Sequence, residues 1–113
     1  MNILSIYDTC THAVPMEQDA FLSRLDTTVR ALMSRFQPHY VCRDRYVTPT
    51  SVRDEIPVYD AYMPAVVDNI LYLTTGDTAR KADYVEEARD AYKTVWSEKA
   101  RGKKFVDGGW YDV

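Results

Sequence analysis

At 113 residues, the chain has the length of a single domain. Hydrophobic residues make up 46% of it and aromatic residues 12%, a composition that supports a packed core and excludes a chain disordered throughout. The net charge of −3 argues against a general nucleic-acid-binding protein, which would carry a strongly basic face.

The first 15 residues contain a short apolar patch, followed by polar residues and Pro15. This pattern predicts a short strand or an extended N-terminal arm. From there to Pro38, apolar residues recur at steps of three and four, the stripe of an amphipathic helix over about residues 16–37. The stripe consists of Phe21, Leu22, Leu25, Val29, Leu32, Met33 and Phe36.

Residues 39–48 change to a period of two, with Tyr40, Cys42 and Tyr46 on one face of an extended chain. A second extended piece covers about residues 51–58. We expect the two pieces to pair as a small β-hairpin that leans on a helix, because a lone hairpin is marginally stable.

A second helix is predicted to begin near Asp60, with Pro64 in its first turn. It is apolar on nearly all sides, which places it at the centre of a bundle. Gly76 and Asp77 indicate a tight helix–helix turn. A third helix follows over about residues 78–99, and Ala82, Val85, Ala88, Tyr92, Val95 and Trp96 are expected on its buried side.

The sequence therefore predicts a mainly α fold, a small bundle of three main helices with a β-hairpin between the first and the second. We divide the chain into an N-terminal arm (residues 1–15), a helical-bundle domain (residues 16–102) and a C-terminal tail (residues 103–113).

Residues 101–113, RGKKFVDGGWYDV, combine a basic run, a glycine pair and three aromatic residues, and no regular element is expected there. A frayed terminus and a docking tail both explain this composition. The free energy gained by burying the apolar surface of one tail nearly equals the entropic cost of ordering its backbone. Docking would therefore be firm only when many copies of the tail bind together. We favour the docking tail, whose contact residues would be Arg101, Lys103, Lys104, Phe105, Trp110 and Tyr111.

No pattern of catalytic residues is apparent. His12 and His39 stand apart from any nucleophile, and Cys10 and Cys42 form neither a C-x-x-C motif nor a disulfide framework, so a reduced, intracellular setting is expected. There is no phosphate-binding loop. We expect no enzymatic activity, no cofactor and no metal. With neither a signal peptide nor a stretch of about 18 apolar residues, a soluble, cytoplasmically made protein is expected.

Two further groups are candidates for contacts. Tyrosines outside helix cores and arginines in the predicted hairpin could meet another subunit or a partner; they are Tyr40, Arg43, Arg45 and Tyr46. The third predicted helix also carries acidic residues interleaved with basic ones, which indicates a solvated, ion-paired face; they are Asp83, Glu86, Glu87 and Asp90.

Residues 56–100 combine several features in a fixed order: a proline-closed extended piece leads into an apolar helix, a Gly-Asp turn and a long charged helix with inward tyrosines. The positions that define this pattern are Ile56, Pro57, Asp60, Leu71, Tyr72, Leu73, Gly76, Asp77, Tyr84 and Tyr92. The pattern resembles the head–tail connector (adaptor) proteins of tailed bacteriophages, and the order of elements is similar to theirs from about residue 20.

The resemblance implies a structural virion protein at the head–tail junction, assembled as a ring, commonly a dodecamer, beneath the portal protein. Such a ring extends the DNA channel and offers the tail or the next neck protein a docking surface, while C-terminal extensions reach the portal. Double-stranded DNA would pass without specific binding, and the acidic residues of the third predicted helix are candidates for the channel lining.

Two alternatives remain open. One is another phage assembly protein, such as a tail-completion or stopper protein, which would be richer in β-structure. The other is a small phage regulatory protein that acts through protein–protein contacts.

Overall fold

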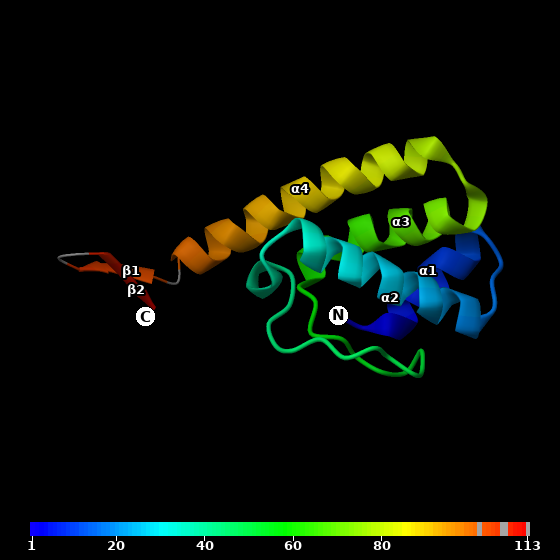
Figure 1. Ribbon diagram of the computed structural model, residues 1–113, viewed down its shortest axis with the longest axis horizontal. Helices are drawn as coiled ribbons and strands as arrows, with labels where there is room; N and C mark the ends of the chain where they lie inside the picture. Colours follow the sequence, from blue (N-terminus) through cyan, green and yellow to red (C-terminus); the bar gives the residue numbers. More distant parts are fainter. Residues whose placement is uncertain (102, 107–108, 113) are drawn as a thin grey trace.

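The computed structural model describes residues 1–101, 103–106 and 109–112, and the side chains of residues 1–100 (Figure 1). In this part of the chain the protein is mainly helical, as predicted, with four α-helices instead of three. They are α1 (Ile3–Ala13), α2 (Gln18–Arg35), α3 (Met63–Thr75) and α4 (Thr78–Arg101), and two 3₁₀ turns, η1 (Pro38–Tyr40) and η2 (Asp60–Tyr62), flank the loop between α2 and α3.

The predicted N-terminal arm is wrong, because residues 3–13 form helix α1. Ile3, Ile6 and Cys10 follow one another at steps of three and four, and all three are fully buried. Asn2 caps the helix by accepting a hydrogen bond from the backbone N–H of Ser5 at 3.3 Å. The apolar stripe is only three residues long and polar residues surround it, so periodicity alone did not reveal it.

The predicted β-hairpin between α2 and α3 is also absent from the described residues. Residues 41–59 form an irregular loop, with isolated antiparallel bridges between Cys42 and Val58 and between Asn2 and Glu55. The apolar residues that suggested strands are core anchors of this loop instead: Val41, Val52, Ile56 and Val58 are all buried. Prolines at positions 49 and 57 lack the N–H that a continuous ladder needs.

Helices α3 and α4 form an antiparallel pair. Gly76 ends α3 with φ of 75°, the left-handed conformation that a side chain disfavours. The Asp77 carboxylate then accepts a hydrogen bond from the N–H of Ala79 at 3.0 Å, at the start of α4. Asp60, where the second predicted helix was expected to begin, begins η2 instead, and α3 starts at Met63. The small residues Ala88 and Ala91 are buried on α4 and allow the two helices to lie close together.

Helix α4 is longer than α3 and its last turns extend beyond the body (Figure 1). Past its end, where no regular element was expected, β1 (Lys103–Val106) pairs antiparallel with β2 (Gly109–Asp112). The molecule therefore measures 54 × 28 × 21 Å. Within the described residues, no helix is long and apolar enough to cross a membrane.

Candidate interaction surfaces

An aromatic cluster holds the second half of α4 against the body. The ring of Tyr92 stacks on Phe36 with centroids 4.9 Å apart and meets the edge of Tyr40 at 5.5 Å. Lys99, two turns further along α4, donates a hydrogen bond to the carbonyl of His39 at 2.8 Å and lies over the ring of Tyr40. Aromatic pairs and cation–π contacts of this kind stabilise a helix beyond their buried area. The C-terminal half of α4 is therefore held firmly although it extends past α3.

Beside this cluster lies an exposed tryptophan. Trp96 is 52% exposed, whereas the sequence pattern predicted it on the buried side of the helix. The correction has a geometric cause: successive residues of an α-helix lie about 100° apart around its axis, so Val95 reaches the core at 1% exposure while Trp96 does not. Tyr92, Lys93, Trp96 and Ser97 line a shallow hollow of about 350 Å³. Large exposed aromatic side chains are the residues that most often anchor protein–protein interfaces.

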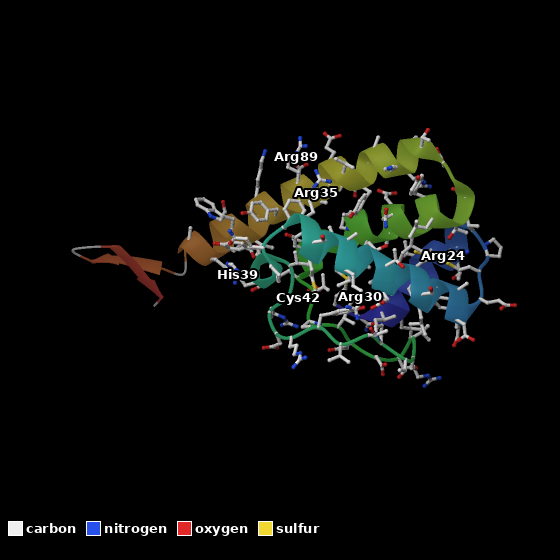
Figure 2. The ribbon with its side chains drawn as sticks, in the orientation of Figure 1. Arg24, Arg30, Arg35, His39, Cys42 and Arg89 are labelled. Atoms are coloured by element: carbon white, nitrogen blue, oxygen red, sulfur yellow. The ribbon has the colours of Figure 1, made fainter. Side chains whose placement is uncertain are left out.

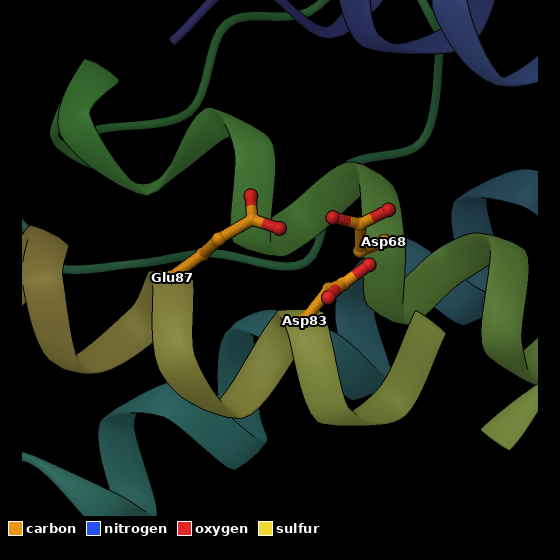
Figure 3. Close-up of side chains that lie close together, drawn as sticks. All are labelled: Asp68, Asp83 and Glu87. Atoms are coloured by element: carbon orange, nitrogen blue, oxygen red, sulfur yellow. The ribbon is translucent and has the colours of Figure 1, made fainter. Parts of the chain in front are cut away.

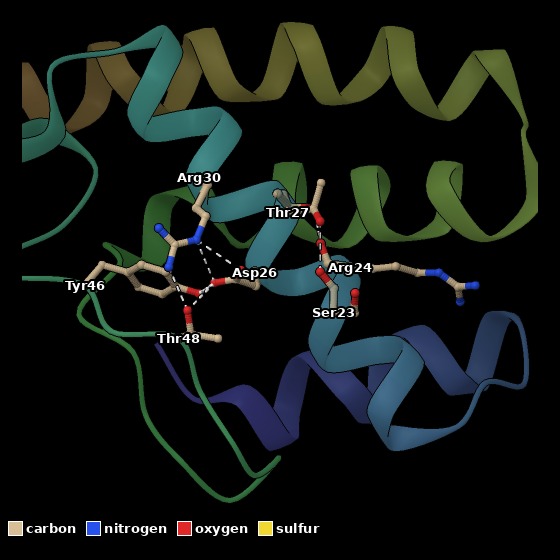
Figure 4. Close-up of polar contacts among 8 residues, drawn as sticks. Ser23, Arg24, Asp26, Thr27, Arg30, Tyr46 and Thr48 are labelled. Atoms are coloured by element: carbon tan, nitrogen blue, oxygen red, sulfur yellow. Dashed lines mark hydrogen bonds and ion pairs between the residues drawn. The ribbon is translucent and has the colours of Figure 1, made fainter.

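Tyr46 takes part in a polar cluster that ties the irregular loop to α2 (Figure 4). Its hydroxyl donates to Asp26 Oδ1 at 2.7 Å, and the Thr48 hydroxyl donates to the same oxygen at 3.1 Å. Arg30 Nε donates to Asp26 Oδ2 at 3.0 Å, and Arg30 also donates to the Thr48 hydroxyl. This internal network gives Tyr46 a role in holding the loop.

The other three contact candidates from the predicted hairpin, Tyr40, Arg43 and Arg45, differ in how exposed they are. Tyr40 is half-buried in the aromatic cluster described above, while Arg43 and Arg45 are exposed and form no ion pair with a described side chain. Of these four candidates, the two arginines are therefore the ones whose side chains are exposed to another molecule. Their role in such a contact stays a prediction.

The acidic residues of α4 divide into two groups. Asp83, Glu86 and Asp90 are exposed. Glu87 is half-buried and turns toward α3, where its carboxyl group meets those of Asp68 and Asp83 with oxygens within 4.8 Å of one another (Figure 3). Arg80 Nη1 pairs with Asp68 Oδ1 at 2.9 Å.

This crowding changes the acidity of Glu87. Burial raises the pKa of the Glu87 carboxyl to about 7, and the hydrogen bond with Asp68 and the negative charges of Asp68 and Asp83 act in the same direction. The positive charge of Arg80 opposes them. Carboxylates at this spacing are suitable cation ligands, but Arg80 pairs with Asp68, and protonation of Glu87 relieves the repulsion in the cluster without a metal.

Sequence reasoning missed Asp68, although a signal was present. Asp68 and Asn69 form a polar pair inside an otherwise apolar helix, and both are buried. Asn69 Nδ2 donates to the buried Thr28 hydroxyl at 2.7 Å, which links α3 to α2. A polar pair in a central helix indicates that neighbouring helices supply partners.

The cysteines and histidines form no reactive site in the part of the chain whose side chains are described. Burial raises the pKa of the Cys10 thiol to about 12, and burial also raises the pKa of Cys42, so both thiols stay protonated. His39 and Cys42 lie in the segment that follows α2 (Figure 2), where Cys42 Sγ is 3.7 Å from the sulfur of Met33. His12 is exposed at the end of α1.

The predicted docking tail can be placed only in part. The backbone of residues 103–106 and 109–112 forms β1 and β2. Its expected contact residues have side chains outside the described part of the structure; they are Arg101, Lys103, Lys104, Phe105, Trp110 and Tyr111. Comparison of the chain with protein-family models, with curated proteins and with solved structures finds no match.

Proposed function

We propose that this chain is a structural virion protein, a ring-forming head–tail connector of a tailed bacteriophage. The observation that carries the proposal is the projecting end of α4. The exposed Trp96 lies there next to a firmly packed body, and β1 and β2 continue the chain outward. A rigid body with an outward extension is suited to joining neighbours in an assembly.

The two-stranded form of that extension supports docking to a larger partner. An isolated pair of short strands is marginally stable in water, so β1 and β2 gain stability when they pack against another surface. One copy would bind weakly, whereas a ring presents many copies at once and binds by multivalency. The partner we propose is the portal protein, with the opposite side of the ring offered to the tail.

The exposed acidic residues of α4 support passage of DNA without binding. Asp83, Glu86 and Asp90 lie on the surface, and carboxylates facing a channel would repel phosphates. Glu87 is not part of this proposed lining, because its carboxyl group turns toward α3. The mainly helical fold favours a connector over a stopper protein, the alternative expected to be rich in β-structure. No catalytic role is proposed.

The test is co-sedimentation with DNA-filled phage heads that lack this protein, prepared from the phage that encodes it. The full chain should sediment with the heads, and a version ending at Gly102 should remain in the supernatant while keeping its helical circular dichroism. Binding by both versions would retain the connector and remove the tail from its mechanism. If neither version bound, the chain would not be a connector and the regulatory alternative would take its place.

A further inference from the structure

The two strands past the end of α4, which we call the ribbon, leave both of their outer edges unpaired. In the described residues β1 and β2 form a two-stranded sheet in which each strand pairs with the other alone. Their backbones pair in register from Lys103 with Asp112 to Val106 with Gly109. Residues of an antiparallel pair alternately direct their N–H and C=O groups toward the partner strand and away from it. Half of the four residues in each strand therefore direct these groups outward.

No described residue of the body pairs with these edges. The ribbon lies past the last turn of α4, away from α1, α2 and α3 (Figure 1), and the described residues contain no other strand. An extended strand is the structure that offers the matching row of N–H and C=O groups to a free sheet edge. The occupant of each edge is therefore a strand, and the ribbon of another copy supplies one.

We propose that β1 of one molecule pairs antiparallel with β2 of the next. This contact is heterologous, and when it repeats around a ring the ribbons close into a barrel in which every strand has two partners. Two-fold contacts, β1 with β1 or β2 with β2, would leave one edge of each molecule unpaired. The inference rests on the proposed function for the ring itself and adds the contact that closes it.

The spacing of such a barrel suits the helix that carries each ribbon. Neighbouring strands lie about 4.8 Å apart, so a molecule that contributes two strands repeats about every 10 Å. Packed helices lie about 8–10 Å apart between their axes, which allows the last turns of adjacent α4 helices to contact each other. Trp96 lies in these turns and is 52% exposed, so a large apolar side chain is available to fill this contact.

The bodies need more room than the ribbons. The molecule is 28 and 21 Å across its two shorter axes, about two to three times the repeat of the ribbons. The bodies therefore splay outward from a narrow ring of ribbons, and adjacent α4 helices meet only near their C-terminal ends. The exposed Trp96 lies at that end of α4.

The experiment is a disulfide scan between full-length chains that carry one added cysteine each. Every residue of β1 is replaced by cysteine in turn, and so is every residue of β2. Each β1 variant is mixed with each β2 variant at high protein concentration and oxidised, so that every register between two molecules is sampled. A disulfide needs Cβ atoms about 3.5–4.5 Å apart, a spacing that adjacent strands provide. Cys10 and Cys42 are buried, and the wild type measures any background from them.

We expect at least one mixture to form disulfide-linked dimers, at a yield at least tenfold above that of either variant alone. A β1 strand has no β1 neighbour in the barrel, so a β1 variant alone should stay unlinked, and the same holds for β2. The control is Ser34→Cys, at an exposed position of α2. It should form no dimer above background with any β2 variant.

Two results would overturn the inference: no mixture above the control, or dimers formed equally well by a β1 or a β2 variant alone, which would indicate a two-fold contact. The head-binding assay keeps this outcome separate from the proposed function. Binding to heads without these disulfides would retain the connector and reject the contact. Formation of the disulfides without head binding would retain the contact and reject the connector.

Discussion

Glu87 of α4 and Asp68 of α3 direct their carboxyl groups toward each other across the helix pair, joined by Asp83 and balanced by Arg80. Two carboxylates this close cannot both ionise at low cost. The pKa of Glu87 is accordingly raised from 4.5 to about 7, with burial as the main cause.

This relationship predicts how stability depends on pH. A group whose pKa is higher in the folded state stabilises the fold when protonated, and this contribution is lost as pH rises through the folded-state value. Glu87→Gln mimics the protonated carboxyl, so we expect the variant to gain stability over the wild type at pH 8 and to match it near pH 4.5. Thermal unfolding at both pH values measures the difference.

The control for this prediction is Glu86→Gln, an exposed neighbour on the same helix. Its melting temperature should follow that of the wild type at both pH values. A Glu87→Gln variant with the same advantage at pH 4.5 as at pH 8 would show that Glu87 does not take up a proton in this range.

Tyr62 has a buried hydroxyl with no hydrogen-bond partner among the described residues. A buried polar group without a partner loses its hydration, at a cost of about 1–3 kcal/mol. Tyr62→Phe removes only this oxygen, so we expect the free energy of unfolding to stay the same or to rise by about 1 kcal/mol. Urea titration followed by circular dichroism measures it.

Tyr7→Phe is the matched variant for comparison. The Tyr7 hydroxyl donates to the carbonyl of Met16 at 3.2 Å, so its removal should lower the free energy of unfolding by about 1 kcal/mol. Equal losses in the two variants would indicate that the Tyr62 hydroxyl does have a partner, such as a buried water.

Asp26 is the acceptor at the centre of the cluster that holds the loop of residues 41–59. Burial alone would raise the pKa of Asp26, but hydrogen bonds from Tyr46, Arg30 and Thr48, together with the charge of Arg30, lower it overall. We expect Asp26→Asn to lose about 1–2 kcal/mol at pH 7, because hydrogen bonds to a charged acceptor are the stronger ones.

The pH dependence of this loss has the opposite sign to that of Glu87. A lowered folded-state pKa contributes stability above the ordinary value of 3.8, and the contribution is lost as pH falls below it. The difference between wild type and Asp26→Asn should therefore shrink toward pH 3. Amide hydrogen exchange should show faster exchange confined to the loop, and unchanged exchange there would contradict the role of Asp26.

Trp96 is predicted to act in assembly and to contribute little to the fold. The Trp96 side chain is 52% exposed, so its ring is only partly removed from water. We therefore expect Trp96→Ala to change the free energy of unfolding by less than about 1 kcal/mol. Self-association should weaken at least tenfold, because exposed tryptophans are the commonest anchors of interfaces.

Val47→Ala is the control for Trp96, because Val47 is also an exposed apolar residue, at 70%, and lies on the loop of residues 41–59. It should leave both stability and association as they are. If Trp96→Ala associated like the wild type, Trp96 would have no place in the subunit contact.

The helices that could be predicted are those whose own sequence contains enough signal. The stripe of α2 repeats over several turns, and α3 and α4 are bounded by Gly76 and Asp77, whose conformation and capping act locally. Local rules of periodicity and capping suffice in such segments.

What only the tertiary structure decided depends on neighbours distant in the chain. Residues 3–13 form a helix because three of their apolar side chains pack into the core. Residues 41–59 stay irregular because their apolar side chains are buried one by one, without the backbone pairing of a β-sheet. Glu87 meets Asp68 only when α3 and α4 pair, and Trp96 is exposed because packing of α4 turns its neighbour Val95 toward the core. Burial and charge proximity are properties of packed pairs, so a pattern along one segment cannot determine them.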